Sequence, residues 1–238
     1  MQAVILAGGL GSRLKEVVSN VPKPMANVAG RPFLEYLLIK LKNSGVEEVF
    51  ISVGYKGSIV KSFFGSGEKF GLSISYSEEG DGLLGTGGAL KFAIHFFGNR
   101  LEDDFLVLNG DSFLDIDLEK FFNFHLVQNG IATIALVRVA NGERYGTVKL
   151  KNNVHIVLFC EKGAKGDGLV NAGVYAINKE QFSLLLPEKK VFSLEKDVFP
   201  LLINRGLFGT EVEGYFIDIG IPTDYKKAEE YFKMWSMT

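Results

Sequence analysis

The beginning of the chain constrains its fold more than any other part of the sequence. Residues 3–6 form a short apolar run, Ala-Val-Ile-Leu, which is typical of a strand buried on both faces. A glycine-rich segment, residues 7–13, follows directly. Glycines let backbone N–H groups approach an anion closely, and a helix that starts after them adds its N-terminus. Because ligands of open α/β sheets bind beyond the carboxyl ends of strands, this opening predicts an α/β fold with an anion site.

Strand-like and helix-like segments then alternate through the first half of the chain. Expected strands are 3–6, 49–53, 73–76 and 105–108, and expected helices are 33–41, 58–64, 89–97 and 118–128. The second half is dominated by strands, at 132–139, 146–150, 154–159 and 170–177, followed by a helix at 194–203, strands near 210 and 216, and a helix at 223–234. We predict one domain, 1–238, with a Rossmann-like, mixed but mainly parallel sheet, helices on both faces, and antiparallel strands in the second half.

Composition excludes several classes of protein. The net charge of −2 argues against a nucleic-acid binder, and one cysteine, Cys160, forms neither an internal disulfide nor a thiolate metal cluster. The chain shows neither a signal peptide nor an apolar run long enough to cross a bilayer, so we expect a cytoplasmic protein without a membrane partner. The 20 phenylalanines are expected in the core, with a homo-oligomer surface as the alternative.

Two cations lie in or near the glycine-rich segment. Arg13 can fork onto phosphate oxygens, and Lys23 stands between Pro22 and Pro24, which stiffen the backbone around it. The segment is not a P-loop, and Leu14 replaces the third glycine of the dinucleotide fingerprint. A triphosphate cradle is therefore one interpretation, and a tight turn with an exposed lysine is the other.

Together these residues resemble a known family. Leu6–Leu14 combined with Pro22–Met25 is similar to the opening signature of the sugar-phosphate nucleotidylyltransferases, and residues 17–38 most resemble the bacterial D-glycero-α-D-manno-heptose 1-phosphate guanylyltransferases. The resemblance continues through 84–90, 109–111, 161–162, 171–175 and 218–225, with Ile221 where members often carry threonine. Members with an acyltransferase or isomerase half have long C-terminal extensions, so we expect the transferase alone.

The resemblance implies a nucleotide-diphospho-sugar transferase fold and a reaction. GMP would pass from GTP to a heptose 1-phosphate, giving GDP-heptose and pyrophosphate for surface polysaccharide biosynthesis. A nucleotide-binding part would cover roughly 1–112 and a sugar-binding part roughly 113–238. The implied nucleotide-binding residues are Leu6, Ala7, Gly8, Gly9, Gly11, Ser12, Arg13, Lys23, Gly85, Thr86, Gly87, Gly88, Asn109 and Gly110. Those implied for the sugar are Glu161, Lys162, Asn171 and Gly173, and the implied catalytic residues are Arg13, Lys23, Asp111 and Lys162.

The resemblance also implies that Asp111 and Asp218 bind Mg²⁺. Asp111 follows a buried strand, which suits a hard cation that takes oxygen ligands, although either aspartate could instead form a turn or cap a helix. Gly87 and Gly88 would let a flat base lie against the backbone. The choice of guanine over uracil or thymine, and of heptose over hexose, rests on the resemblance alone.

Other functions stay open at this point. One is a uridylyl-, thymidylyl- or guanylyltransferase acting on a hexose 1-phosphate. Another is a non-catalytic regulatory subunit that binds nucleotide sugars, although such subunits commonly lose a metal carboxylate. A dinucleotide oxidoreductase is disfavoured by the broken glycine fingerprint.

Overall fold

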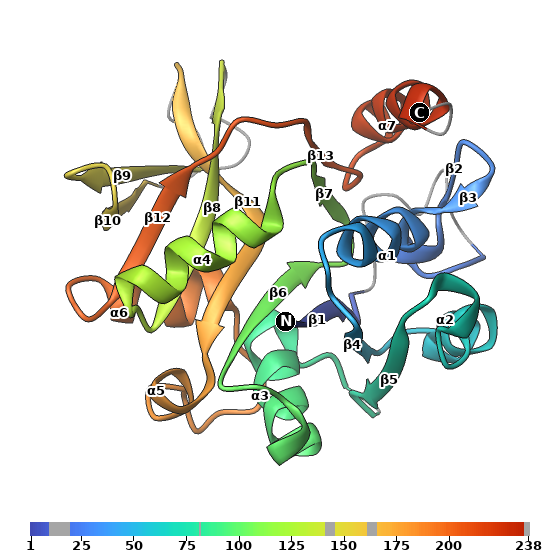
Figure 1. Ribbon diagram of the computed structural model, residues 1–238, viewed down its shortest axis with the longest axis horizontal. Coiled ribbons are helices and arrows are strands. Elements are labelled where there is room, and N and C mark those ends of the chain that lie inside the picture. Colours follow the sequence, from blue (N-terminus) through green and yellow to red (C-terminus); the bar gives the residue numbers. More distant parts are fainter. Residues whose placement is uncertain (10–19, 81, 141–145, 161–165, 236–238) are drawn as a thin grey trace.

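The computed structural model describes residues 1–9, 20–80, 82–140, 146–160 and 166–235. Its centre is a nine-stranded mixed sheet with the strand order β5-β4-β1-β6-β11-β8-β12-β10-β9 (Figure 1). Four parallel strands come from the first half: β1 (Gln2–Ala7), β4 (Glu48–Val53), β5 (Ser73–Glu78) and β6 (Asp104–Asn109). The predicted α/β fold with a mixed sheet is confirmed.

The second half extends this sheet with antiparallel strands. Strand β11 (Gly168–Asn178) pairs antiparallel with β6 and with β8 (Ala132–Val139), and β12 (Leu207–Glu211) lies parallel to β8. Strands β9 (Thr147–Lys151) and β10 (His155–Cys160) complete the edge. The register of β11 shifts between Asn171 and Tyr175, where Gly173 has a φ of +73°. This irregularity is a β-bulge, and a glycine inside a strand often marks one.

Helices cover both faces because side chains of the strands alternate between two cores. In β1, Ala3 and Ile5 belong to one core, and Val4 and Leu6 to the other. The first core is covered by α1 (Phe33–Asn43), α2 (Gly57–Phe64), α4 (Leu118–Gln128) and α7 (Pro222–Trp235). The second is covered by α3 (Gly85–Phe97), α5 (Lys179–Ser183), the π-helix η6 (Leu194–Val198) and α6 (Phe199–Leu202).

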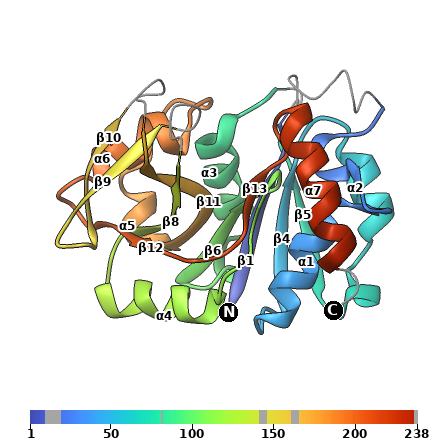
Figure 2. The ribbon, with the colours of Figure 1, turned by 90° about the horizontal axis from the view of Figure 1, so that it is seen from above.

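Helix α7 brings the C-terminal part of the chain back to the first half (Figure 2). The buried ring of Phe232 stacks on Tyr36 of α1 with centroids 3.9 Å apart, and meets Phe113 edge-on at 4.9 Å. Aromatic pairs of this kind add to the free energy gained by burial. The packing fixes the strand that precedes α7, and with it Asp218.

Several short elements were not expected from the sequence. They are the ribbon of β2 (Asn27–Val28) and β3 (Arg31–Pro32), the strand β7 (Ser112–Leu114), which pairs with the strand predicted near 216, β13 (Phe216–Asp218), and the 3₁₀ turns η2 (Lys23–Met25), η3 (Glu68–Phe70) and η4 (Gly98–Arg100). The helix predicted at 194–203 is a π-helical turn followed by a short α-helix. Among the described helices, none has the length and apolar character needed to cross a membrane.

Candidate active site

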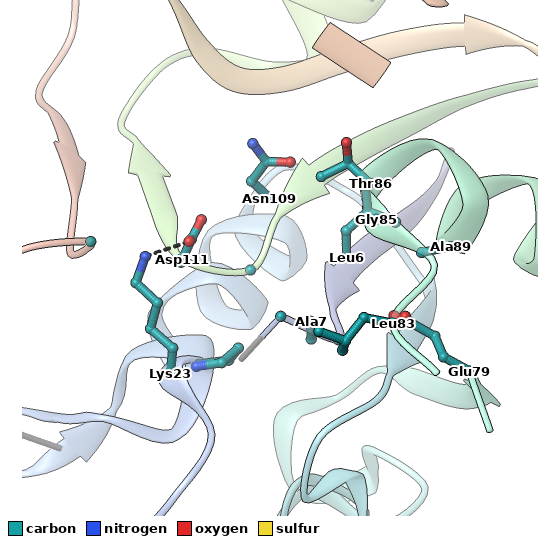
Figure 3. Close-up of a pocket in the computed structure, with 15 residues that line it drawn as sticks. Leu6, Ala7, Lys23, Glu79, Leu83, Gly85, Thr86, Ala89, Asn109 and Asp111 are labelled. Carbon is teal, nitrogen blue, oxygen red and sulfur yellow. Dashed lines mark hydrogen bonds and ion pairs between the residues drawn. The ribbon is translucent and has the colours of Figure 1, made fainter. Parts of the chain in front are cut away.

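A cavity of about 310 Å³ opens where β1 and β6 end. This is the sheet edge at which α/β folds bind ligands. It is lined by Leu6, Ala7, Gly8, Gly9, Lys23, Pro24, Glu79, Leu83, Gly85, Thr86, Ala89, Asn109, Gly110, Asp111 and Gly220 (Figure 3). Nine of the predicted nucleotide residues and the predicted metal ligand Asp111 therefore share one cavity.

The two predicted metal carboxylates converge, although 107 positions separate them in the sequence. Strand β7 pairs with β13 so that Asp218 lies opposite Ser112, and Ile219 N–H donates to the Asp111 carbonyl at 3.0 Å. The Gly220 N–H donates to Asp218 Oδ1 at 2.6 Å, which orients that carboxylate. A two-strand ladder of three residue pairs thus brings both aspartates together.

Lys23 lies between these carboxylates. Its Nζ is 2.5 Å from Asp111 Oδ2 and 3.6 Å from Asp218 Oδ1, and the lysine side chain is only 10% exposed. Figure 3 shows the side chains of Lys23 and Asp111 pointing toward each other. Pro22 precedes the 3₁₀ turn and Pro24 lies within it, as the stiffening role of both prolines predicts. A position between two carboxylates, occupied here by an ammonium group, is one that favours a cation.

Close backbone packing forms the floor of the cavity. The Gly110 N–H donates to the Leu6 carbonyl at 2.9 Å, and a Cβ atom on Gly110 would come within 2.9 Å of that oxygen. Only glycine permits this approach of the segment after β6 to β1.

The expectation that Gly87 and Gly88 leave room for a base stays a prediction, and the structure gives both glycines a packing role. Both lie buried within the first turn of α3, which starts at Gly85 rather than Ala89. A Cβ atom on Gly87 would lie 2.3 Å from the Phe192 ring, and one on Gly88 would lie 2.2 Å from the Lys190 carbonyl oxygen. Both N–H groups donate to the Phe192 carbonyl. These glycines admit the 190–192 segment, while Gly85 and Thr86 face the cavity.

The predicted sugar residues Asn171 and Gly173 lie behind Asn109 rather than in the cavity wall. Asn171 Oδ1 accepts from the Gly173 N–H at 2.8 Å, and its Nδ2 donates to the Tyr175 hydroxyl at 3.1 Å. A Cβ atom on Gly173 would lie 3.0 Å from Asn109 Nδ2, so the bulge brings β11 against the end of β6. Gly11, Ser12, Arg13, Glu161 and Lys162 lie outside the described residues.

Glu79 is a cavity residue that the sequence analysis missed. Its Oε2 accepts from the Leu84 N–H at 3.0 Å, and a Cβ atom on Gly8 would lie 1.6 Å from its Oε1. Burial raises the pKa of Glu79, and no ion pair recorded in the described part of the chain involves it. The carboxylate therefore offers the cavity unused hydrogen-bond acceptors. Its place after β5, at a sheet edge, was the available signal.

The fold and the carboxylate–lysine cluster define an α/β protein with a glycine-lined, cation-favouring site at the carboxyl edge of a Rossmann-like sheet. The sequence pattern of the nucleotidyl transferase family matches residues 2–233, and the chain belongs to this family.

Two relatives narrow this further. The chain is 41% identical over 231 residues to the D-glycero-α-D-manno-heptose 1-phosphate guanylyltransferase of Aneurinibacillus thermoaerophilus, covering 97% of both chains. It is 41% identical over 228 residues to the enzyme of that name from Campylobacter jejuni, covering 94% of this chain and 97% of the relative. The crystal structure of HddC from Yersinia pseudotuberculosis complexed with GMP-PN superposes with a TM-score of 0.84 and 34% identity, over 98% of this chain and 99% of that chain. The predicted family is confirmed.

Proposed function

We propose that the protein transfers GMP from GTP to D-glycero-α-D-manno-heptose 1-phosphate, which forms GDP-heptose and pyrophosphate for surface polysaccharide biosynthesis. The convergence of Asp111, Asp218 and Lys23 beside a glycine-lined cavity carries the proposal. The two heptose 1-phosphate guanylyltransferases at 41% identity support these substrates.

The reaction needs positioning and charge neutralisation rather than a side-chain nucleophile. A phosphate oxygen of the sugar 1-phosphate attacks the α-phosphorus of GTP and forms a new P–O bond. The bond from the α-phosphorus to the bridging oxygen breaks, and pyrophosphate leaves with those electrons. Lys23 and Arg13 would offset the triphosphate charge, and Lys162 would bind the sugar phosphate. Glu161 and Asn171 would bind the sugar hydroxyls, and Gly173 would leave room for the sugar ring.

Asp111 and Asp218 would hold Mg²⁺. Magnesium is commonly bound through one or two carboxylates together with substrate phosphate oxygens, and the donor set here fits that pattern. Among the described residues no cluster of three or more metal-ligating side chains exists, so phosphate oxygens would supply further ligands. When bound, the ion would neutralise charge that develops on the transferring phosphate.

Glu79 supports guanine as the base. The edge of guanine presents two adjacent donors, N1–H and N2–H₂, and a carboxylate can accept from both. Uracil and thymine instead present a single N–H between two carbonyl oxygens, which would face the carboxylate unfavourably. Within the described residues Glu79 accepts from the Leu84 N–H alone, and its remaining acceptors in the cavity match guanine.

Pyrophosphate release tests this with GTP, UTP and dTTP, each combined with heptose, mannose and glucose 1-phosphates in Mg²⁺. Glu79→Gln should lower kcat/KM for GTP about 5- to 150-fold, which is the range for one two-point base contact. Glu78→Gln is the matched control, because Glu78 is the exposed neighbour that pairs with Lys61. No release with any combination would overturn the transferase, and an unchanged GTP preference in Glu79→Gln would overturn the base assignment.

A further inference from the structure

The carboxylate of Glu195, just outside the cavity, accepts hydrogen bonds from three hydroxyl groups. Its Oε2 accepts from Thr86 Oγ1 at 2.8 Å and from Ser193 Oγ at 2.7 Å. Its Oε1 accepts from the Tyr175 hydroxyl at 3.1 Å. Glu195 lies on the π-helix η6, and Thr86 lies in the first turn of α3 and lines the cavity. One side chain thus connects three hydroxyl groups, from α3, from β11 and from the residue that caps η6.

The proton of each serine or threonine hydroxyl is directed at Glu195, because backbone groups use the acceptor side. Thr86 Oγ1 accepts from the Leu194 N–H at 2.9 Å. Ser193 Oγ accepts from the Lys196 N–H at 3.2 Å. Each hydroxyl has a single proton, so each donates that proton to the carboxylate.

The Tyr175 hydroxyl is directed in the same way by two amides. Asn171 Nδ2 donates to it at 3.1 Å, and Asn109 Nδ2 lies 3.5 Å from it. The orientation of Asn171 is fixed, because its Oδ1 already accepts from the Gly173 N–H. Tyr175 is fully buried, and burial together with the charge of Glu195 raises the pKa of its hydroxyl well above the usual range. The tyrosine therefore stays protonated and donates to Glu195.

We propose that Glu195 is a positioning residue that couples the nucleotide side of the active site to the sugar side. Thr86 and Asn109 line the nucleotide cavity, and Asn171 is the residue proposed for the sugar. Glu195 holds Thr86 directly and reaches both asparagines through Tyr175. Binding that orders one end of this network lowers the entropic cost of ordering the other end. The proposal rests on the proposed function.

A glutamine cannot replace Glu195 in this network. All three hydroxyls donate, so the amide N–H₂ of a glutamine at this position would meet a donor whose acceptor side is already occupied. Asp197 lies in the same helical turn but has a different role. It accepts from the backbone N–H of Ser193 at 2.7 Å and pairs with Lys189 at 2.8 Å, and neither contact involves one of the three hydroxyls. Asp197→Asn is therefore the matched control for Glu195→Gln.

The test measures steady-state kinetics of Thr86→Val and Tyr175→Phe, alone and together, with Glu195 or with Glu195→Gln. Both substitutions nearly conserve shape, and thermal unfolding checks that each variant folds. With Glu195 present, Thr86→Val should raise KM for the sugar phosphate about fivefold or more, as expected for coupled sites. The fold increase in KM for the sugar phosphate should be smaller in the double variant than the product of the fold increases in the two single variants. In the Glu195→Gln background, Thr86→Val should leave the sugar KM unchanged.

Three results would overturn the coupling. One is a fold increase in the sugar KM of the double variant equal to the product of the increases caused by Thr86→Val and Tyr175→Phe, because substitutions at independent sites combine in that way. Another is an unchanged sugar KM in Thr86→Val. The third is an Asp197→Asn variant that raises both KM values as much as Glu195→Gln does, because this would indicate a general role in folding the segment. Absence of turnover in the unsubstituted protein would instead overturn the proposed function, and the coupling with it.

Discussion

Asp111 is the residue on which the proposed chemistry depends most directly. We expect Asp111→Asn to lower kcat about a hundredfold or more, because loss of charge stabilisation at a reacting phosphate costs several kcal/mol. The thermal midpoint should change little, since the side chain lies at the cavity rather than in a core. Pyrophosphate release at saturating substrates and a thermal melt measure the two effects.

Asp115 provides the control for that prediction. It also pairs with a lysine, Lys40, at 2.5 Å, but it lies at the other end of β7 and outside the cavity. Asp115→Asn should therefore keep wild-type kcat. Equal losses in Asp111→Asn and Asp115→Asn would indicate that lysine pairing, rather than the site, explains the result.

Among individual residues, those that belong to short local motifs could be predicted from the sequence. Lys23 and Asp111 belong to short, recognisable segments, and the structure brings them together with Asp218. Glu79 could not be found in that way. Its position depends on the absence of a side chain at Gly8, 71 residues earlier, and no local pattern carries that relation.

The first turn of α3 is the element whose packing most limits substitution near the cavity. A Cβ atom on Gly88 would meet a backbone oxygen, that of Lys190, which cannot rotate away. We expect Gly88→Ala to destabilise the protein by about 1–3 kcal/mol, the usual cost of overpacking. A Cβ atom on Gly82 would meet nothing within 4 Å, so Gly82→Ala should change stability by less than about 1 kcal/mol. Urea unfolding compares the two, and equal stabilities would contradict the packing argument.

Elements with strong local signals were predicted well. Helix α4 has the predicted bounds, since Asp117 caps it and accepts from the Lys120 N–H at 2.9 Å. Strand β7 and its pairing with β13 were missed because each strand has three residues and gains its stability from a partner far away in sequence. The early start of α3 was missed because glycines at 85, 87 and 88 disfavour a helix until the 190–192 segment packs against them.

The described part of the molecule is built around its nine-stranded sheet, which lies between two cores, and this arrangement explains why the site forms. The first core joins α1, α4 and α7 across β1, and the second joins α3 to η6 and α6. The site therefore uses residues from both ends of the chain, on one sheet edge. The division into a nucleotide part at 1–112 and a sugar part at 113–238 stays a prediction. The Thr86–Glu195 contact crosses that boundary, so the parts are not independent units.

His125 makes the stability of the folded protein depend on pH in a predictable way. It is buried in α4, and its ring nitrogens lie 2.8 Å from Thr133 Oγ1 and 3.2 Å from Asp104 Oδ1. Burial lowers the pKa of His125, and the nearby carboxylate of Asp104 opposes this only in part. Below the ordinary histidine pKa of 6.5, the unfolded chain therefore binds a proton that the folded protein does not. Stability is thus fully present above pH 6.5 and declines as the pH falls through that value.

We expect the thermal midpoint to drop between about pH 7 and about pH 5.5, and the drop to be smaller in His125→Gln, whatever the stability of that variant at neutral pH. The carboxylates with lowered pKa, Asp197 and Glu211, lose their contribution only in a more acidic range. Glu79 acts in the opposite direction because its pKa is raised, but it is present in both proteins and cancels in the comparison. His155→Gln, which removes an exposed histidine, is the control substitution. If the thermal midpoint falls equally with pH in the wild type and in His125→Gln, then His125 does not link proton binding to unfolding.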